Sequence, residues 1–186
     1  GRTELVRMIF GADNYLGDIY IKGKKVKIKS PTDAIRYGIS LLPEDRKSQG
    51  LLLNMGIDFN LSMIVLKSLT KNGFISSDEE KKVVDEYIKM ISIKTPSGKQ
   101  LVRNLSGGNQ QKVVLAKWMA TKSDIIIIDE PTRGIDLGAK AEIYELMDRL
   151  AMQGKSIIMI SSELPELIGM SDRAVVMHEG EIVGEV

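Results

Sequence analysis

The chain has 186 residues, and its 43% of hydrophobic residues is ordinary for one globular domain with a substantial core. Lysine and arginine (26) balance aspartate and glutamate (25), which argues against the basic surface that nucleic-acid binding requires. The absence of cysteine excludes disulfides and thiolate zinc sites, and no apolar run approaches the length of a membrane span.

The first half of the chain predicts a short helix, a hairpin, one buried strand and then a helical segment. Residues 4–10 have the pattern of a short helix, and residues 18–26 alternate like a hairpin with a glycine-containing turn. Residues 37–42 form an apolar strand that Pro43 ends. From about 57 to 104 apolar residues recur at helical spacing, so we interpret this part as a helical insert.

In the second half of the chain, predicted strands alternate with predicted helices. The order is a strand at 124–129, a helix at 138–153, a strand at 156–161, a helix at 165–170 and a terminal hairpin at 173–184. This alternation predicts a mainly parallel sheet covered by helices, with antiparallel hairpins added to it. The predicted fold class is therefore α/β.

A hydroxyl residue and two glycines, Ser106-Gly107-Gly108, stand just before a predicted helix over 110–120. Backbone amides at a helix N-terminus carry partial positive charge, and glycine lets that backbone approach a phosphate closely. The three residues therefore predict an anion contact. The alternative is that Ser106 simply caps the helix.

Two adjacent carboxylates, Asp129 and Glu130, follow an apolar run of four isoleucines. Ligands bind at the carboxyl ends of strands in a parallel sheet, so we expect both side chains at the ligand edge. Magnesium prefers oxygen ligands and keeps several waters, which suits Asp129, and Glu130 is then the candidate base for an attacking water. The alternative is a solvated acidic pair without a ligand.

The opening residues Gly1-Arg2-Thr3 resemble the end of a phosphate-binding P-loop. Such a loop ends in Gly-Lys-Ser/Thr, where the lysine neutralises phosphates and the hydroxyl binds magnesium. In this interpretation Arg2 replaces the lysine, Thr3 supplies the hydroxyl, and the preceding strand and loop residues are missing. Arginine is a planar fork donor and is not equivalent to a point-charge ammonium. The alternative is that Gly1 to Thr3 only begin a helix.

Together these motifs resemble the ATP-binding-cassette (ABC) ATPases, with a signature sequence at 105–113 and a Walker B motif at 125–132. With Arg2 in the P-loop and Pro43-Glu44-Asp45-Arg46-Lys47 after the strand, the whole chain resembles a narrower group. That group is the second, C-terminal nucleotide-binding domain of tandem ATPase subunits from bacterial simple-sugar importers of the ribose, xylose and galactose type.

The resemblance implies an ABC-type P-loop ATPase core at 1–55 and 105–186, and a helical signature subdomain at 56–104. The N-terminal strands and most of the P-loop of that core are expected to be missing. The implied cofactors are ATP and Mg²⁺. The implied nucleotide-binding residues are Gly1, Arg2, Thr3, Glu44, Ser106, Gly107, Gly108, Gln110, Asp136 and Ser162; the implied metal ligands are Asp129 and Thr3, and the catalytic residue is Glu130.

In the family, the signature contacts the γ-phosphate of ATP held by a different nucleotide-binding domain, and Asp136 lies in the D-loop at the interface. Two departures from the family pattern weaken the chain's own site. Glu44 stands where the family has a glutamine that senses magnesium and the membrane partner. Ser162 stands where the family has a switch histidine, and its hydroxyl cannot carry charge. The intact signature is expected to serve the first domain's P-loop.

The resemblance implies an ATPase that couples ATP binding and hydrolysis to carbohydrate uptake, with the isolated fragment inactive. The implied partners are the N-terminal nucleotide-binding domain of the same subunit, the membrane subunits through the helical insert, and indirectly a sugar-binding protein. The implied location is the cytoplasmic side of the inner membrane, without nucleic acid. Two alternatives stay open: a soluble ABC-type ATPase, and a non-hydrolytic regulatory or dimerisation module.

Overall fold

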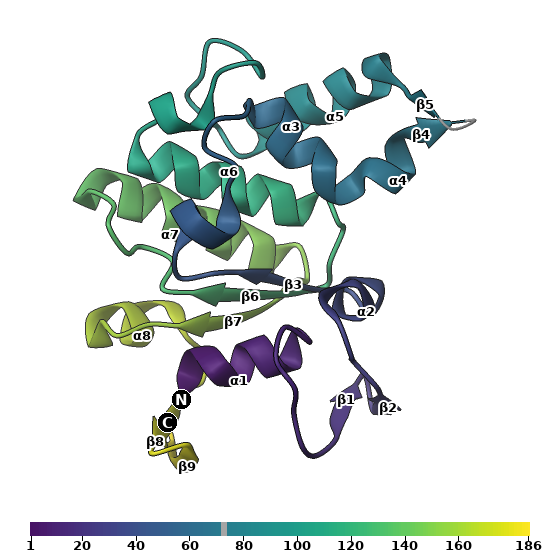
Figure 1. The fold of residues 1–186 in the computed structure, drawn as a ribbon. Coiled ribbons are helices and arrows are strands. Elements are labelled where there is room, and N and C mark those ends of the chain that lie inside the picture. The colour runs from purple at the N-terminus through teal and green to yellow at the C-terminus, as the bar shows by residue number, and fades with distance from the viewer. Residues whose placement is uncertain (72–73) are drawn as a thin grey trace. The chain divides into compact units, whose positions relative to one another are not determined.

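The computed structural model describes residues 1–71 and 74–186, which divide into two compact units (Figure 1). The sheet unit contains residues 1–44, 123–131 and 147–186, and the helical unit contains residues 45–122 and 132–146. Each unit is therefore assembled from separated segments of the chain. None of the helices in the described ranges is long and apolar enough to cross a membrane.

The sheet unit is built on three parallel strands in the order β3-β6-β7 (Figure 1). These strands are β3 (Ile39–Leu42), β6 (Ile125–Asp129) and β7 (Ser156–Ile160). Ile39 pairs with Ile125, which pairs on its other side with Ser156. All of β3 and most of β6 are buried, as expected for near-continuous apolar runs in a parallel sheet. The predicted parallel sheet is confirmed.

Helices and two antiparallel hairpins complete the sheet unit. They are α1 (Arg2–Ile9), β1 (Ile19–Ile21), β2 (Lys24–Val26), α2 (Pro31–Arg36), α8 (Leu164–Met170), β8 (Val175–His178) and β9 (Glu181–Glu185). Lys22 and Gly23 both have positive φ, 50° and 75°, which fits a tight two-residue hairpin turn. The predicted first helix and both hairpins are confirmed.

Helix α2 was not predicted, although the sequence carries its start signals. The Ser30 hydroxyl accepts a hydrogen bond from the Asp33 amide at 3.3 Å, and Pro31 occupies the first turn. Serine as the cap and proline in the first turn are common at helix starts. The helix is only six residues long, so its apolar period is too short to stand out.

The helical unit contains the predicted insert and the helix that follows it. Its elements are a π-helical turn (Arg46–Gly50), α3 (Ile57–Ser62), a 3₁₀ turn (Met63–Val65), α4 (Leu66–Leu69), β4 (Thr70–Lys71), β5 (Phe74–Ile75), α5 (Ser77–Met90), a 3₁₀ turn (Val102–Asn104) and α6 (Gly107–Met119). Helix α7 (Leu137–Met152) contributes residues to both units.

The predicted insert is mainly helical, but the hairpin β4–β5 interrupts it and residues 91–101 are not helical. Two-residue strands are too short to produce an alternating pattern, and residues 72–73 of the predicted insert lie outside the described residues. Helix α6 packs with α3 and α5 within the helical unit. The boundaries at 55–56 and 104–105 stay a prediction, since a packing unit need not coincide with a functional subdomain.

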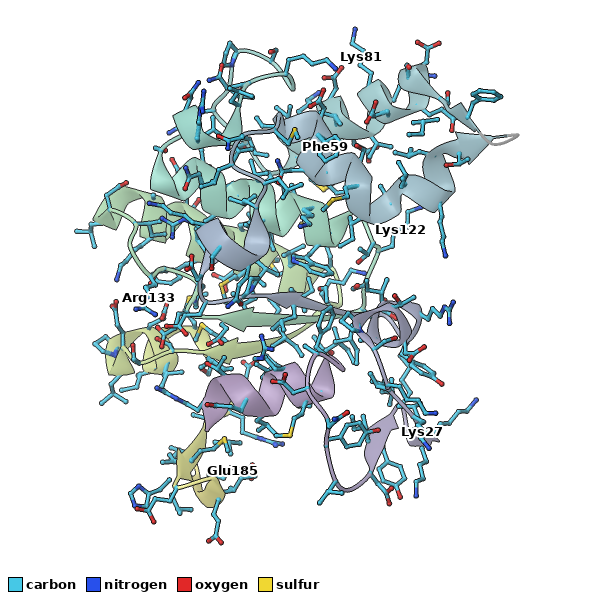
Figure 2. The ribbon with its side chains drawn as sticks, viewed as in Figure 1. Lys27, Phe59, Lys81, Lys122, Arg133 and Glu185 are labelled. Carbon is cyan, nitrogen blue, oxygen red and sulfur yellow. The ribbon has the colours of Figure 1, made fainter. Side chains whose placement is uncertain are left out.

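Each unit has its own apolar core and a charged surface. In the sheet unit the core contains Ile127 and Leu42, both at most 1% exposed. In the helical unit Ile57 and Leu61 of α3 are completely buried. Charged side chains such as those labelled Lys27, Lys81 and Glu185 are exposed (Figure 2). Polar side chains that are buried in either unit are expected to have hydrogen-bond partners, and one that lacks a partner needs a physical reason.

Candidate functional site

Asp129 is the last residue of β6, and its carboxylate is buried without being fully satisfied. The residue is 1% exposed, and its Oδ1 has no hydrogen-bond partner. Burial raises the pKa of this carboxyl, while a hydrogen bond from the Thr3 side chain and the charge of Arg2 act in the opposite direction. An unpartnered buried oxygen costs free energy, so the site fits an additional ligand.

The chemistry of Asp129 and Thr3 fits magnesium. A carboxylate and a hydroxyl lie together, and oxygen ligands are those that magnesium prefers. The described residues contain no group of three or more His, Cys, Asp or Glu that could hold a metal by themselves. Magnesium commonly takes only one or two protein ligands and fills its remaining positions with water and phosphate.

The predicted residues at the start of the chain lie in the first turn of α1. Gly1 is the N-cap of this helix, so these residues begin a helix, and whether they also bind phosphate stays a prediction. The Arg2 guanidinium donates a hydrogen bond from Nη1 to the carbonyl of Ser161 at 2.7 Å. The Thr3 side chain acts on the Asp129 carboxyl, whose pKa it lowers. A helix start and a phosphate site are compatible, because free amides at a helix N-terminus attract anions.

Glu130 follows the strand in a strained conformation. Its φ is 51°, in the left-handed region that costs a non-glycine residue about 1–2 kcal/mol. The Glu130 amide donates to the carbonyl of Ile160 at 2.9 Å, and the Ser162 hydroxyl donates to Glu130 Oε2 at 3.1 Å. Backbone strain of this kind persists where surrounding structure enforces it, and it gathers at functional sites.

The carboxyl ends of the three parallel strands therefore bring several predicted residues to one edge of the sheet unit. Glu44 follows β3, the pair Asp129 and Glu130 ends β6, and Ser162 follows β7. Glu44 is half-buried. The Ser161 side chain donates a hydrogen bond to the buried carboxylate of Glu166 and accepts one from the Glu163 amide, which fixes the turn after β7.

Ser106 caps α6 in the helical unit, as the alternative interpretation expected. Its Oγ accepts hydrogen bonds from the Asn109 amide at 3.4 Å and from Asn109 Nδ2 at 3.0 Å. Asn109 Oδ1 in turn accepts from the Lys94 amide at 2.7 Å. Capping leaves Ser106 exposed, so a contact between this helix start and an anion stays a prediction.

The two glycines that follow are closely surrounded by atoms of the helical unit. A Cβ atom at Gly107 would lie 2.9 Å from Arg46 Nη2 and 3.1 Å from the Gly134 carbonyl oxygen. A Cβ at Gly108 would lie 2.5 Å from the Cβ of Ala139. Sequence reasoning assigned both glycines to close approach of a phosphate and missed these internal neighbours.

Gln110 and Asp136 have structural partners of their own. Gln110 is 6% exposed, and its Nε2 donates to the carbonyls of Val102 at 3.2 Å and Leu105 at 3.3 Å. It therefore holds the segment before α6. Asp136 is exposed, and its Oδ1 accepts from the Ala139 amide at 2.9 Å at the start of α7. Contact of either residue with nucleotide or with a partner stays a prediction.

Arg46 was missed as a candidate by sequence reasoning. Its Nη1 donates to the Arg133 carbonyl at 2.7 Å, and its Nη2 donates to the Gly134 carbonyl at 3.1 Å. The side chain is 9% exposed, and burial lowers the pKa of its guanidinium. The Pro43-to-Lys47 run was a signal for this region, but nothing in the sequence distinguishes this buried arginine from a surface one.

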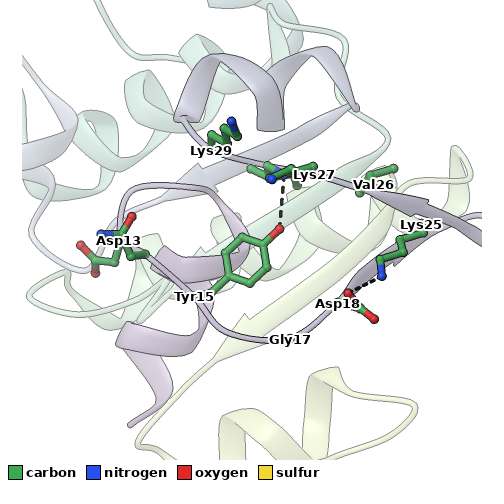
Figure 3. A pocket seen from close by; sticks show the side chains of 10 residues that line it. Asp13, Tyr15, Gly17, Asp18, Lys25, Val26, Lys27 and Lys29 are labelled. Carbon is green, nitrogen blue, oxygen red and sulfur yellow. Dashed lines mark hydrogen bonds and ion pairs between the residues drawn. The ribbon is translucent and has the colours of Figure 1, made fainter.

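A cavity of about 630 Å³ lies beside β2 in the sheet unit and contains none of the predicted site residues (Figure 3). Its acidic groups already have partners in the chain: Asp18 pairs with Lys25 at 2.7 Å and Asp13 with Arg7 at 2.7 Å. The Tyr15 hydroxyl accepts from the Ile28 amide at 3.4 Å. The acidic groups of this cavity are therefore paired, whereas the sheet edge has a buried carboxylate oxygen without a hydrogen-bond partner.

A parallel sheet whose strand ends gather a buried carboxylate, a hydroxyl and a helix start defines a phosphate-binding α/β class of protein. Residues 1–133 match the family described as ABC transporter, and the chain belongs to this family. The prediction of family from the motifs is confirmed.

Curated relatives of this chain include ATP-binding proteins that are named for sugar import. A ribose import ATP-binding protein of Clostridium tetani is 53% identical over 100% of this chain and 37% of the relative. A xylose import ATP-binding protein of Thermoanaerobacter pseudethanolicus is 52% identical over 100% of the chain and 37% of the relative. The chain thus spans little more than a third of the length of these relatives.

Solved structures confirm the predicted fold class. A nucleotide-free ATP-binding cassette from an ABC transporter matches with a TM-score of 0.83 and 22% identity, covering 100% of this chain and 75% of that one. A dimeric ATP-binding cassette in a post-hydrolysis state, bound to ADP and Pi, matches with a TM-score of 0.81 and 22% identity, covering 100% and 80%. At this identity the likeness shows the fold alone.

Proposed function

We propose that this chain is the second ATP-binding domain of a tandem ATPase subunit in a bacterial simple-sugar importer, coupling ATP binding and hydrolysis to carbohydrate uptake. The proposal draws on relatives that are named for ribose and xylose import and match the whole chain at 52–53% identity. The one observation that carries it is the buried Asp129 carboxylate, whose Oδ1 has no hydrogen-bond partner.

In this proposal Asp129 and Thr3 would hold Mg²⁺, which neutralises charge on phosphate oxygens when it is bound. The Glu130 carboxylate would orient the attacking water and accept its proton. Ser162 donates to Glu130 Oε2 and so holds the orientation of this carboxylate. The left-handed backbone at Glu130 also fixes where its side chain leaves the strand.

The nucleotide site of the chain itself is proposed to be weak. Arg2 stands where a P-loop has lysine, and its guanidinium already donates to the Ser161 carbonyl at 2.7 Å. A planar guanidinium that is already bonded to a carbonyl is a poor substitute for the compact lysine ammonium that binds phosphates. The same observation favours the second candidate function, a non-hydrolytic regulatory module that binds nucleotide without turning it over.

The start of α6 is proposed to complete the ATP site of the first nucleotide-binding domain. Ser106, Gly107 and Gly108 open a helix of 13 residues, whose N-terminal amides supply partial positive charge for a γ-phosphate. Asp136 would lie at the interface with that domain, and its exposure is compatible with such a contact. Gln110 would act by holding the segment before the helix.

The helical unit is proposed to contact the membrane subunits. Met55, Phe59, Met63 and Leu66 recur at helical spacing along α3, α4 and their flanks, and each is 40–46% exposed. Phe59 is labelled in Figure 2. Clustered exposed apolar side chains mark interaction surfaces. In this proposal the chain is cytoplasmic and peripheral to the inner membrane, and it meets a sugar-binding protein only indirectly.

Mixing this chain with a first nucleotide-binding domain that carries an intact P-loop tests the proposal. Mg-ATP turnover should be absent for the chain alone and should appear and saturate as the chain is added. Ser106→Arg should abolish this stimulation because it blocks the helix start, whereas Ser97→Arg, at another exposed serine of the helical unit, should not.

Glu130→Gln should leave the stimulation intact, because the site completed by this chain would use the carboxylate of the partner domain. Turnover by the chain alone that rises more steeply than its concentration, and disappears in Glu130→Gln, would contradict a weak site. Binding of nucleotide without stimulation of any first domain would favour the non-hydrolytic module instead.

A further inference from the structure

We propose that Arg46 is a positioning residue, which fixes the loop 132–136 against the start of α6 and so sets the direction of Ser106 and the two glycines toward ATP. This inference rests on the proposed function of the α6 start, but it concerns a residue to which the sequence motifs gave no role. The loop, the first glycine of α6 and Arg46 itself all belong to the helical unit.

The guanidinium of Arg46 binds two successive carbonyls of the loop. Nη1 donates to Arg133 at 2.7 Å and Nη2 donates to Gly134 at 3.1 Å. Two donors in a rigid planar fork fix both the distance and the angle of the backbone that they hold. Gly134 has a φ of 65°, a left-handed conformation that most residues would not adopt at this point of the loop.

The same guanidinium also lies beside the start of α6. A Cβ at Gly107 would lie 2.9 Å from Nη2 of Arg46, 3.1 Å from the Gly134 carbonyl oxygen and 3.4 Å from Ile135 Cγ2. Arg46 and the loop therefore lie immediately beside the first glycine of α6. A change in the Arg46 side chain must change the support of both the loop and the helix start.

The burial of the Arg46 side chain is unfavourable in free energy. The side chain is 9% exposed, its Nε is buried without a hydrogen-bond partner, and the guanidinium bonds from Nη1 and Nη2 go to neutral carbonyls. Burying a charge against uncharged partners costs free energy that an apolar side chain would avoid. The need for two donors at a fixed angle accounts for this cost.

The segment that carries Arg46 is held at both of its ends. Asp45 caps the π-helical turn by accepting from the amides of Lys47 at 2.9 Å and Ser48 at 3.2 Å. At the other end, the Gly50 carbonyl accepts from Nζ of Lys117 in α6 at 2.9 Å. π-Helical turns are rare and frequently occur at functional sites. A displacement of this turn would therefore be transmitted to α6 through Lys117 and Arg46.

The variants Arg46→Gln and Arg46→Lys test this role, with Arg103→Gln as the matched control. Arg103 is an exposed arginine of the same unit that donates to Asn54 Oδ1 at 3.0 Å. In the mixture with a first nucleotide-binding domain, Arg46→Gln should lower the maximal turnover about tenfold or more, since small misplacements of a positioned group reduce rates strongly. The chain concentration at half-maximal stimulation should change less than about twofold.

Arg46→Lys keeps the positive charge but loses the two fixed donors of the guanidinium. Its turnover should therefore lie between those of Arg46→Gln and the unchanged chain. Arg103→Gln should behave as the unchanged chain. Equal stimulation by Arg46→Gln and the unchanged chain would overturn the inference. So would a loss of turnover that merely follows a loss of folded protein in thermal unfolding.

Amide hydrogen exchange of the chain alone separates this inference from the proposed function. Arg46→Gln should accelerate exchange in the loop 132–136 and at residues 106–109, leaving the centre of α6 protected. Localised acceleration supports the positioning role even where the unchanged chain stimulates no partner, a result that would contradict only the proposed function. Uniform acceleration across α6, or none in either segment, would overturn the positioning role.

Discussion

The edge of the parallel sheet and the start of α6 are both expected to meet phosphate, yet they are built in opposite ways. At the sheet edge Asp129 has a buried oxygen without a partner, and Glu130 has a strained backbone. At the start of α6 the Ser106 hydroxyl is bonded and Gly108 packs directly against Ala139. The first region presents a buried carboxylate oxygen without a partner, whereas Ser106 and Gly108 of the second have their neighbours within the chain.

This difference determines how each region should respond to substitution. Replacing an unsatisfied or strained residue should stabilise the fold, although the group that would act on the ligand is lost. Adding atoms to a closely packed region should destabilise the fold. The sign of the stability change therefore distinguishes a site shaped for a ligand from a site shaped by internal packing.

Gly108→Ala should give the largest effect, a loss of about 1–3 kcal/mol in the free energy of unfolding. Its new Cβ would lie 2.5 Å from that of Ala139, and both atoms are attached to helical backbone that cannot rotate away. Gly169→Ala is the matched control, because it lies in α8 with nothing within 4 Å of its added Cβ. Thermal unfolding should show a loss for the first variant and no loss for the second.

Asp129→Asn should raise the free energy of unfolding by about 1 kcal/mol at neutral pH, since it removes a buried charge. Its pKa is raised by burial, so the cost of ionisation is absent in acid and complete above the raised pKa. The gain from asparagine should therefore shrink as the pH falls. Calorimetry across pH checks this, and a gain that persists unchanged in acid would contradict the assignment.

Asp124→Asn should show the opposite sign, because this exposed carboxylate immediately precedes the same strand. Hydrogen bonds from Lys22, and then Lys155, lower the pKa of Asp124. A lowered pKa contributes stability above the ordinary range of the carboxyl, and this contribution is lost as the pH falls through the folded value. Asp124→Asn should therefore destabilise slightly at neutral pH and become neutral in acid, in the same calorimetric series.

Glu130→Gly should stabilise the fold by about 1 kcal/mol through relief of the left-handed conformation. Glu130→Gln keeps the strain and should leave the stability unchanged, while Glu130→Asn should gain an intermediate amount because asparagine tolerates this region. Chemical denaturation of the three variants checks this order. An equal response from Gln and Gly would show that the backbone at Glu130 is not strained.

Ser162→Ala should have the smallest effect, within about 0.5 kcal/mol, because its hydrogen bond to Glu130 is exposed. The Glu130 carboxylate loses the 3.1 Å contact that orients it, but turnover stimulated in a first nucleotide-binding domain should stay unchanged, because that site would use the carboxylate of the partner domain. Parallel measurements of thermal unfolding and turnover check this. A large drop in unfolding temperature would mean that Ser162 supports the fold.

The elements that depend on local pattern could be predicted from the sequence, and those that depend on distant contacts could not. The four-isoleucine run predicted β6, and the serine before two glycines predicted the start of α6. The burial of Arg46 and the contact of Gly108 with Ala139 arise from segments far apart in the chain. Periodicity contains no information about such neighbours, so the packing role of these residues appeared only in the structure.

The order of the strands has a consequence for how the chain folds. The central strand β6 must pair with β3, and residues 45–122 are synthesised between the two. The ends of this long segment must come together before β3 and β6 can form hydrogen bonds. This loop closure costs conformational entropy and slows folding. Most residues of the helical unit belong to that intervening segment, so this unit can begin to fold before β3 pairs with β6. Pulse-labelled hydrogen exchange during refolding should therefore protect α5 and α6 before the sheet.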